Sequence, residues 1–366
     1  MNSTSNHALY VHIPFCEHIC PYCDFTKLFY NPEFSRPYLE ALFKEIDSYH
    51  LKKMKTIYLG GGTPTALNDE EFEALLKKVS PLLEKDGEFT CEANVENLTP
   101  SKIDLMVKYG VNRLSIGVQS THDQRLKVIG RHHSYADVFN VINLAKQKGI
   151  RNINVDLMYG FPGQRWCETR DDVVNLLKLG TTHISIYSLT ISKGTKFYHD
   201  NVQPQNEDDA VYFYQKITRL MRTNGFKRYE VSNYAKPGFE SKHNLTYWHN
   251  EEYCGVGLGA SGYLGNIRYT NTRSLKEYLQ GHYKDVEEIV EKDLQVQYYL
   301  MTHLRLEDGF NLDEFKERFD EDLLETKGAE INAMIQRNQM QIKGRNLSFT
   351  DSGILLMDTL ILDLFY

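Results

Sequence analysis

Short apolar segments alternate with longer segments of helical spacing along the first two thirds of the chain. Segments rich in β-branched and aromatic residues predict strands, at 9–13, 56–59, 88–91, 113–117, 152–157, 183–189 and 228–231. Between them, hydrophobic residues recur every three or four positions, as at Phe72, Leu75 and Val79, which predicts helices. Repeated β-α units of about 30–35 residues imply parallel strands with right-handed crossovers. The expected fold is α/β, a partial (β/α)6 barrel with too few repeats for a full eight-stranded one.

The pattern changes after residue 232. Gly, Asn, Tyr and Ser dominate the segment 233–289, which predicts loops and short strands. Helical spacing follows up to residue 339, and the last residues resemble a β-hairpin and a short helix. We therefore expect a barrel at 1–232, a connecting segment at 233–289 and a small winged-helix-like α+β domain at 290–366.

Composition and charge narrow the class of protein. The chain has 366 residues, of which 41% are hydrophobic and 25% charged, so a disordered or collagen-like chain is excluded. The net charge is −7, and residues 291–366 alone carry 8 Lys and Arg against 15 Asp and Glu. An acidic C-terminal region counts against a nucleic-acid partner. We interpret this region as a packing or partner domain.

The chain shows no sequence feature of export or membrane insertion. Its apolar runs are far shorter than the ~20 residues that span a bilayer. The N-terminus lacks the basic start and apolar stretch of a signal peptide. The sequence therefore predicts a cytoplasmic protein without a transmembrane segment.

Three of the six cysteines form a tight cluster. Cys16, Cys20 and Cys23 are spaced C-x3-C-x2-C directly after the first predicted strand. In a long cytosolic chain such a cluster indicates a metal or iron–sulfur site, not disulfides. The other three are expected to be packing thiols: Cys91, Cys167 and Cys254.

Two metal centres fit this spacing. Zinc needs a fourth ligand, which His12 or His18 could supply. A [4Fe–4S] cluster held by three thiolates leaves one iron open, and an open position lets a small ligand bind.

Two glycine-rich segments follow predicted strands. Residues 60–65 read GGGTPT, where a ligand could approach the backbone closely and exposed N–H groups could meet a carboxylate. A tight strand-to-helix turn is the alternative explanation. Residues 257–262 match G-x-G-x-x-G, but they open no convincing helix and lack the following acidic residue, so we reject a dinucleotide site.

Together, these motifs resemble the radical S-adenosylmethionine (SAM) superfamily. The resemblance implies a partial (β/α)6 barrel in which the open iron chelates the amino and carboxylate groups of SAM. It also implies a set of SAM-contacting residues near the ends of the barrel strands, where barrel active sites lie. These are Tyr10, Tyr22, Gly61, Gly62, Thr63, Glu92, Gln119, Arg131 and Asp156.

The motif order is similar to that of the oxygen-independent coproporphyrinogen III oxidases and their relatives. The oxidases have a fourth cysteine two residues after the third, where this chain has Phe25. They also have an N-terminal extension, whereas nine residues precede Tyr10 here. Both differences count against the oxidase.

The segment 243–248, HNLTYW, resembles the HNxxYW motif of the HemW-type haem chaperones. Histidine is a common axial ligand of haem iron, and Tyr and Trp rings can pack on the macrocycle. The resemblance implies a haem site made of His243, Asn244, Tyr247 and Trp248.

The function implied is that of a haem chaperone. Such a protein would bind haem, a [4Fe–4S] cluster and SAM, and would transfer haem to an acceptor such as a respiratory cytochrome. The resemblance therefore favours a delivery protein over an enzyme. It leaves open whether SAM is cleaved, whether the chain forms a homodimer and whether it contacts the membrane peripherally. Two alternatives remain: the oxidative decarboxylation of coproporphyrinogen III, and a radical SAM reaction on another tetrapyrrole.

Overall fold

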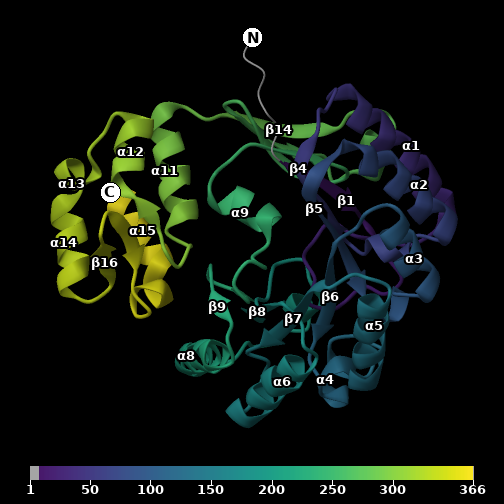
Figure 1. Ribbon diagram of the computed structural model, residues 1–366, viewed down its shortest axis with the longest axis horizontal. Helices are drawn as coiled ribbons and strands as arrows, with labels where there is room; N and C mark the ends of the chain where they lie inside the picture. The colour runs from purple at the N-terminus through teal and green to yellow at the C-terminus, as the bar shows by residue number, and fades with distance from the viewer. Residues whose placement is uncertain (1–7, 366) are drawn as a thin grey trace.

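One 12-stranded sheet forms the centre of the protein (Figure 1). The structure, a computed structural model, describes residues 8–365. Seven neighbouring strands of the sheet run parallel, and the sheet does not close on itself. In spatial order they are β11 (Tyr253–Val256), β1 (Ala8–Ile13), β4 (Met54–Gly61), β5 (Leu83–Asn94), β6 (Arg113–Gln119), β7 (Asn152–Tyr159) and β8 (His183–Ser188).

Helices follow these strands along the chain, which confirms the predicted partial barrel. Polar N-caps start several of them: Asn68 caps one helix, and Ser134 forms a capping box with Asp137 in another. The apolar faces, including Phe72 and Leu75, are fully buried in the main core. The helices are α1 (Pro32–Ser48), α2 (Asp69–Val79), α3 (Pro100–Lys108), α4 (Asp123–Val128), α5 (Tyr135–Gln147), α6 (Trp166–Lys178), α7 (Lys196–His199) and α8 (Glu207–Thr223).

The strand predicted at 228–231 is not a further parallel strand. β9 (Lys227–Arg228) pairs antiparallel with β10 (Asn233–Ala235), which pairs antiparallel with β8. Only four residues separate β9 from β10, and a parallel connection needs a dozen or more. The parallel part of the sheet instead grows at its other edge, where β11 joins β1.

The segment 233–289 contains more regular structure than we expected. The HNxxYW motif, expected within loops and short strands, lies on a helix, α9 (Lys242–Trp248). The G-x-G-x-x-G match forms the turn after β11 and opens no helix, as predicted. Next come β12 (Ser261–Leu264), β13 (Ile267–Asn271), α10 (Leu275–Leu279) and the edge strand β14 (Lys284–Ile289), in which every residue is exposed.

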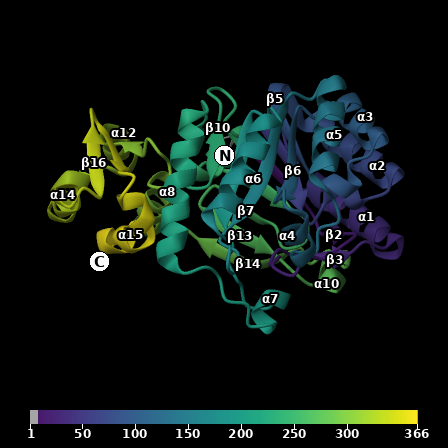
Figure 2. The ribbon, with the colours of Figure 1, turned by 90° about the horizontal axis from the view of Figure 1, so that it is seen from below.

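The C-terminal residues form a small α+β unit (Figure 2), which confirms the expected winged-helix-like fold. This unit has its own apolar cluster. A three-stranded antiparallel sheet packs with five helices, and both Phe315 and Leu347 are fully buried. Within residues 8–365, no helix is both long enough and apolar enough to cross a bilayer. The elements are α11 (Lys292–His303), β15 (Phe310–Asn311), α12 (Leu312–Phe319), α13 (Leu323–Thr326), α14 (Gly328–Gln336), β16 (Met340–Lys343), β17 (Asn346–Phe349) and α15 (Met357–Phe365).

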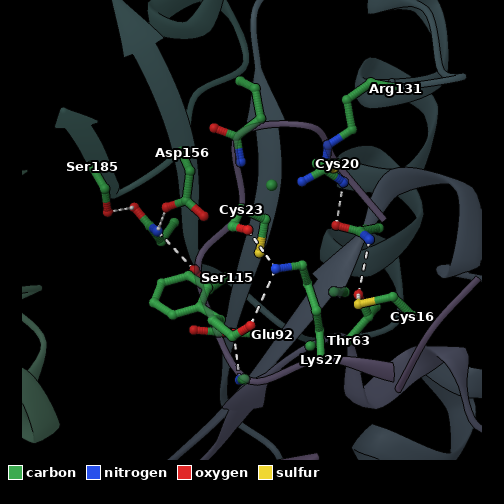
Figure 3. A pocket seen from close by; sticks show the side chains of 18 of the residues that line it. Cys16, Cys20, Cys23, Lys27, Thr63, Glu92, Ser115, Arg131, Asp156 and Ser185 are labelled. Atoms are coloured by element: carbon green, nitrogen blue, oxygen red, sulfur yellow. Dashed lines mark hydrogen bonds between the residues drawn. The ribbon is translucent and has the colours of Figure 1, made fainter. Parts of the chain in front are cut away.

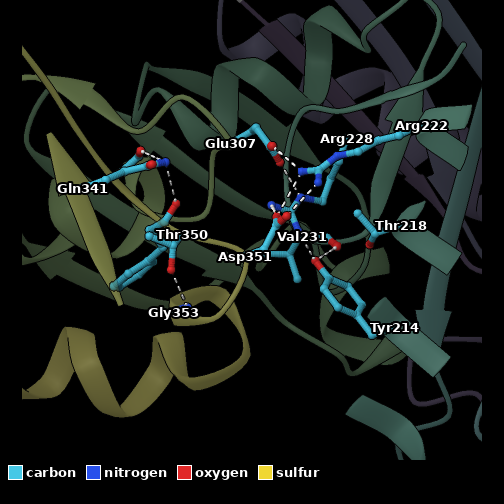
Figure 4. Close-up of polar contacts among 12 residues, drawn as sticks. Tyr214, Thr218, Arg222, Arg228, Val231, Glu307, Gln341, Thr350, Asp351 and Gly353 are labelled. Atoms are coloured by element: carbon cyan, nitrogen blue, oxygen red, sulfur yellow. Dashed lines mark hydrogen bonds and ion pairs between the residues drawn. The ribbon is translucent and has the colours of Figure 1, made fainter. Parts of the chain in front are cut away.

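An ion-pair network joins this unit to α8 and β9 (Figure 4). Arg222 pairs with Glu307 and Asp351 at 2.7 Å each. The buried Arg228 pairs with the same two carboxylates. Part of the acidic charge of the C-terminal region is therefore neutralised by arginines outside that region.

The cysteines outside the cluster differ in exposure. Cys91 and Cys254 are buried, as expected for packing thiols. Cys167 is exposed on α6, so the prediction for this residue is wrong. The expectation about the N-terminus concerns mainly residues 1–7, which lie outside the described residues.

A buried carboxylate ties α1 to the segment around β13. Glu45 accepts hydrogen bonds from the backbone N–H of Gly257 (2.8 Å), from the amide of Asn271 (2.6 Å) and from the hydroxyl of Tyr278. Its side chain is fully buried. Burial raises the pKa of Glu45, and the three donors oppose that shift. One acceptor thus satisfies three donors that have been removed from water.

We predict that Glu45→Ala lowers the free energy of unfolding by at least about 3 kcal/mol, because three buried donors lose their shared acceptor. Urea denaturation measures this change. Glu40→Ala, at an exposed position of the same helix, is the control and should change stability by less than about 0.5 kcal/mol. Equal unfolding midpoints for the two variants would contradict the structural role of Glu45.

Candidate functional site

The three clustered cysteines lie on one loop that is fastened at both ends. β2 (Phe15–Cys16) pairs in parallel with β3 (Leu28–Phe29), so the intervening residues form a closed loop. Within it, the N–H of Cys23 donates to the carbonyl of Cys20 at 3.2 Å, which makes a tight turn. Lys27 also donates to the carbonyl of Cys23. Backbone hydrogen bonds and the Lys27 side chain therefore hold the loop, and its three cysteines line one cavity.

The thiols face a partly desolvated environment. Burial raises the pKa of the Cys16 thiol to about 11, and a hydrogen bond with Thr63 opposes this shift. Burial also raises the pKa of Cys23, with the charge of Lys27 acting in the other direction. Because metals bind thiolates, loading this site would release protons.

Of the two candidate fourth ligands for zinc, His18 borders the same cavity as the cysteines, whereas both ring nitrogens of His12 are already bonded. The Nε2 atom of His12 bonds to the carbonyl of Thr26 at 2.8 Å, and its Nδ1 bonds to the hydroxyl of Tyr10 at 3.0 Å. Across residues 8–365, no three His, Cys, Asp or Glu side chains come close enough to hold one metal ion. The three thiols instead border a common cavity, and thiolates are the usual ligands of iron–sulfur clusters.

This cavity, of about 270 Å³, occupies the inside of the barrel next to the cysteine loop (Figure 3). Cysteine side chains and polar side chains from several strands point into it. Every residue of the predicted SAM set lines it except Tyr10. The lining residues include Cys16, Cys20, Cys23, Tyr22, Tyr58, Gly61, Gly62, Thr63, Glu92, Asn94, Arg113, Ser115, Gln119, Arg131, Asn154, Asp156, Ser185, Tyr187 and Asn244.

Strand alternation explains which side chains reach the cavity. Along β6, Arg113, Ser115 and Gln119 line it, whereas Leu114 and Ile116 belong to the main hydrophobic core. Asn154 and Asp156 of β7, and Ser185 and Tyr187 of β8, repeat this pattern. The sequence analysis missed several of these residues, although polar residues at every second position of an apolar strand were a visible signal.

The N–H groups of the glycine-rich turn bond mainly to the protein itself and support the cysteine loop. The N–H groups of Gly62 and Thr63 donate to the carbonyls of Ile13 and Phe15, both at 2.8 Å. The N–H of Gly61 donates to Glu92. A Cβ on Gly61, where φ is +110°, would lie 2.5 Å from the ring of His12. The expectation that these N–H groups are exposed for a ligand is therefore wrong, because the backbone and Glu92 already use them.

Two carboxylates of the cavity bind protons more readily than usual. Glu92 accepts a hydrogen bond from Tyr58 at 2.6 Å, and burial raises its pKa to about 7, with Asp156 adding to the shift. Burial also raises the pKa of Asp156, which accepts from Asn154 at 2.7 Å. Both groups can thus change charge state when a cationic ligand enters.

The remaining predicted SAM residues have defined partners. Gln119 has the left-handed backbone that is unusual for its type (φ +67°), and its amide oxygen accepts from Tyr187 at 2.8 Å. Arg131 donates to Asn94 and contacts the hydroxyl of Tyr22 at 3.5 Å. The structure therefore brings Gln119, Arg131 and Tyr22 together in one cavity, while Tyr10 lies outside it.

The HNxxYW helix lies at the other end of the barrel strands. Glu88, in the middle of β5 and opposite Thr56 of β4, accepts from the N–H groups of Lys242 and His243 and so caps α9. The Nδ1 atom of His243 bonds to Thr56, near the start of β4, at 2.8 Å. The cysteine loop follows the carboxyl end of β1, which lies beside the carboxyl end of β4. The predicted haem residues and the cysteines thus border opposite ends of the barrel interior.

The haem-motif side chains differ in exposure. His243 is buried, and its Nε2 atom bonds to the hydroxyl of Tyr247 at 2.7 Å. Its ring stacks on that of Tyr58 at 5.0 Å, and burial lowers its pKa to about 3. Asn244 lines the cavity, and Trp248 is half-buried.

Two family models match the chain. The Radical SAM superfamily model matches residues 10–179. The HemN C-terminal domain model matches residues 299–356. Proteins of the radical SAM superfamily use a [4Fe–4S] cluster and SAM.

Individual relatives extend over nearly the whole chain. The heme chaperone HemW of Lactococcus lactis is 37% identical over 94% of this chain and 93% of its own. The heme chaperone HemW of Escherichia coli is 36% identical over 82% of each chain. The solved structure of coproporphyrinogen III oxidase (HemN) from Escherichia coli superposes with a TM-score of 0.86 over 99% of this chain and 90% of its own. Because the two sequences are only 19% identical, this match supports the fold alone. The chain belongs to the HemW family within the radical SAM superfamily.

Proposed function

We propose that the protein is a haem chaperone that binds a [4Fe–4S] cluster, SAM and haem, and passes haem to an acceptor protein. The observation that carries the proposal is that one barrel cavity is bordered by the three cysteines and by α9, the helix of the HNxxYW motif. The HemW relatives named above are heme chaperones. We assign SAM and cluster binding to the barrel at 1–232. Haem binding is assigned to the α9 segment at 233–289, and packing or partner contact to the C-terminal unit at 290–366.

The cluster is assigned to Cys16, Cys20 and Cys23, whose thiols share one loop and one cavity. A fourth ligand from the protein is not needed, because the free iron would take SAM. Phe25 stands where the oxidases have a further cysteine, and its side chain is 65% exposed. The chain therefore offers three thiols here and no more.

SAM is assigned to the cavity beside the cluster, where it would bring a positively charged sulfonium. The carboxylates of Glu92 and Asp156 line this cavity and supply negative charge when ionised. Gln119, Arg131 and Tyr22 add polar contacts from neighbouring strands and loops. Gly61, Gly62, Thr63 and Tyr10 are assigned mainly a supporting role, since they hold the cysteine loop and His12.

Haem is assigned to α9, with His243 as the axial ligand. Its low pKa keeps the imidazole neutral at physiological pH, and the neutral ring is the form that binds iron. Its Nε2 atom is bonded to Tyr247, so iron can reach it only after the Tyr247 hydroxyl moves. Asn244 and Trp248 would then border the macrocycle from the same helix.

Delivery requires a partner that takes haem. A respiratory cytochrome suits the role, since such proteins receive haem as a cofactor. The small C-terminal unit, with its acidic surplus, is the surface we assign to contact with a partner. Peripheral contact with the membrane and a homodimer are compatible with this role.

The alternative is oxidative decarboxylation of coproporphyrinogen III. The missing fourth cysteine at Phe25 and the HNxxYW motif both count against it. An anaerobic assay with reductant, SAM and coproporphyrinogen III separates the two functions. Formation of protoporphyrinogen at catalytic turnover would reject the chaperone in favour of the oxidase.

We predict that Cys16→Ala, Cys20→Ala and Cys23→Ala each abolish the cluster, because each removes one of only three thiolate ligands. Iron analysis and visible absorbance after anaerobic reconstitution measure this. Cys167→Ala, which removes an exposed thiol on α6, is the control and should keep full iron content. A full iron complement in any of the three variants would refute the ligand assignment.

We predict that SAM binds about tenfold more tightly at pH 8 than at pH 6. The reason is that Glu92, with a pKa of about 7, is mostly protonated at pH 6 and mostly ionised at pH 8. The ionised carboxylate attracts the sulfonium, whereas the protonated form does not. Equilibrium dialysis on the cluster-loaded protein measures the profile. Glu92→Gln should flatten it, while Glu84→Gln, at an exposed position of the same strand, should leave it unchanged. A profile that survives Glu92→Gln would assign the titration to another group.

We predict that His243→Ala weakens haem binding by at least about tenfold and shifts the Soret band, because the axial ligand is lost. Titration of haem into the purified protein, followed by absorbance, measures both effects. His249→Ala, an exposed histidine at the end of the same helix, is the matched control. Unchanged affinity together with an unchanged Soret band would remove His243 as the ligand.

A further inference from the structure

Arg113 is a buried cation without a hydrogen-bond or ion-pair partner among residues 8–365. It begins β6, and only 2% of its surface is exposed. Within residues 8–365 its guanidinium makes no hydrogen bond and no ion pair, and its Nε atom is fully enclosed. Arg228, which is equally shielded, pairs with both Glu307 and Asp351. A buried guanidinium without a direct hydrogen-bonding partner is costly, so the position of Arg113 favours an anion that can reach it.

The groups around Arg113 do not supply that anion. Asn154 is already saturated, because its amide group donates to Ser115 at 2.8 Å and to Asp156 at 2.7 Å. Its oxygen is bonded to Ser185 at 3.1 Å and to His183 at 2.7 Å. Glu92 and Asp156 share the cavity with Arg113, and its charge opposes the rise that burial causes in the pKa of each, but neither forms a hydrogen bond or an ion pair with it. Arg113 therefore borders the cavity without a direct partner among residues 8–365.

The position of Arg113 identifies the end of the cavity from which a ligand would come. Arg113 pairs with Thr90 of β5, two residues beyond Glu88, whose carboxylate accepts from the N–H group of His243 on α9. Asn244, from the same helix, lines the cavity. Gln119, at the far end of β6, is six residues away, about 20 Å along the strand. Arg113 thus lies beside the haem motif and away from the cysteine loop.

Two ligands could supply a carboxylate, SAM and the ligand that binds at α9, and the distance of Arg113 from the cysteine loop distinguishes them. The methionine carboxylate of SAM is expected at the open iron, next to the cysteine loop, whereas Arg113 lies toward the opposite end of the strand. A carboxylate that enters from α9 belongs to the second ligand. Haem carries two propionates, and the planar guanidinium fork matches a carboxylate with two parallel hydrogen bonds.

Building on the proposed function, we propose that Arg113 anchors a propionate of the haem that binds at α9. The propionate extends past Asn244 into the barrel interior and meets the guanidinium there. Only this side arm reaches the cavity, while the ring of the macrocycle stays against α9, the helix that carries His243.

The test compares haem with its dimethyl ester, in which both propionates are blocked. Both are titrated into the cluster-loaded wild type, Arg113→Gln and Arg113→Lys. We expect Arg113→Gln to weaken haem binding about 10- to 100-fold, with Arg113→Lys in between. The ester should bind wild type as weakly as haem binds Arg113→Gln, and should be insensitive to the substitution. SAM affinity, measured in parallel, should not change.

Arg151→Gln is the control, because Arg151 is exposed immediately before β7, near the same end of the barrel. It should bind haem and ester as wild type does. Equal affinity of wild type for haem and ester would overturn the anchor, and this comparison needs no variant that folds. A loss of haem and ester binding by the same factor in Arg113→Gln would also overturn it, as would a loss of SAM affinity alone. If wild type binds no haem at all, the proposed function fails first, and the anchor fails with it.

Discussion

Alternation along parallel strands is the constraint on which the site depends. Each strand of the barrel must present apolar side chains to the helices, as Leu114 and Ile116 do, so every second side chain points inward. The inward positions are filled largely by polar groups, including Arg113, Glu92 and Asp156. Polar groups placed in a confined interior have perturbed charge states or lack partners, and both effects mark the cavity as a place for ligands.

A single tyrosine connects the two ends of this interior. The ring of Tyr58 stacks on His243 at the α9 end, and its hydroxyl donates to Glu92 nearer the cysteine loop. Glu92 in turn accepts a hydrogen bond from the N–H group of Gly61, which belongs to the turn that supports that loop. A displacement of His243 by a ligand would therefore be felt by the carboxylate assigned to SAM. The fold offers this connection through stacking and hydrogen bonding, without any moving domain.

The repeating units and the cysteine spacing could be predicted from the sequence because both are local signals. The antiparallel direction of the strand predicted at 228–231 could not be predicted. It depends on the length of the connection between β9 and β10 and on pairing with β8. The glycine turn shows a similar limit: three glycines indicate a close approach, but only tertiary structure shows that the approaching group is His12. Likewise, HNxxYW indicates chemistry, whereas the burial of His243 depends on strands nearly 200 residues earlier.

Among residues 8–365 the sheet ends at β14, and the backbone edge of this strand has consequences for association. Four of its six residues are charged, with one lysine (Lys284) and three acids (Asp285, Glu287 and Glu288), and all six are exposed. A second copy that added its own β14 would bring two strands of net negative charge together, which is unfavourable. Charged residues on an exposed edge also discourage aggregation by strand addition. Any homodimer of this chain is therefore expected to use a different surface, and this edge favours a strand with basic side chains.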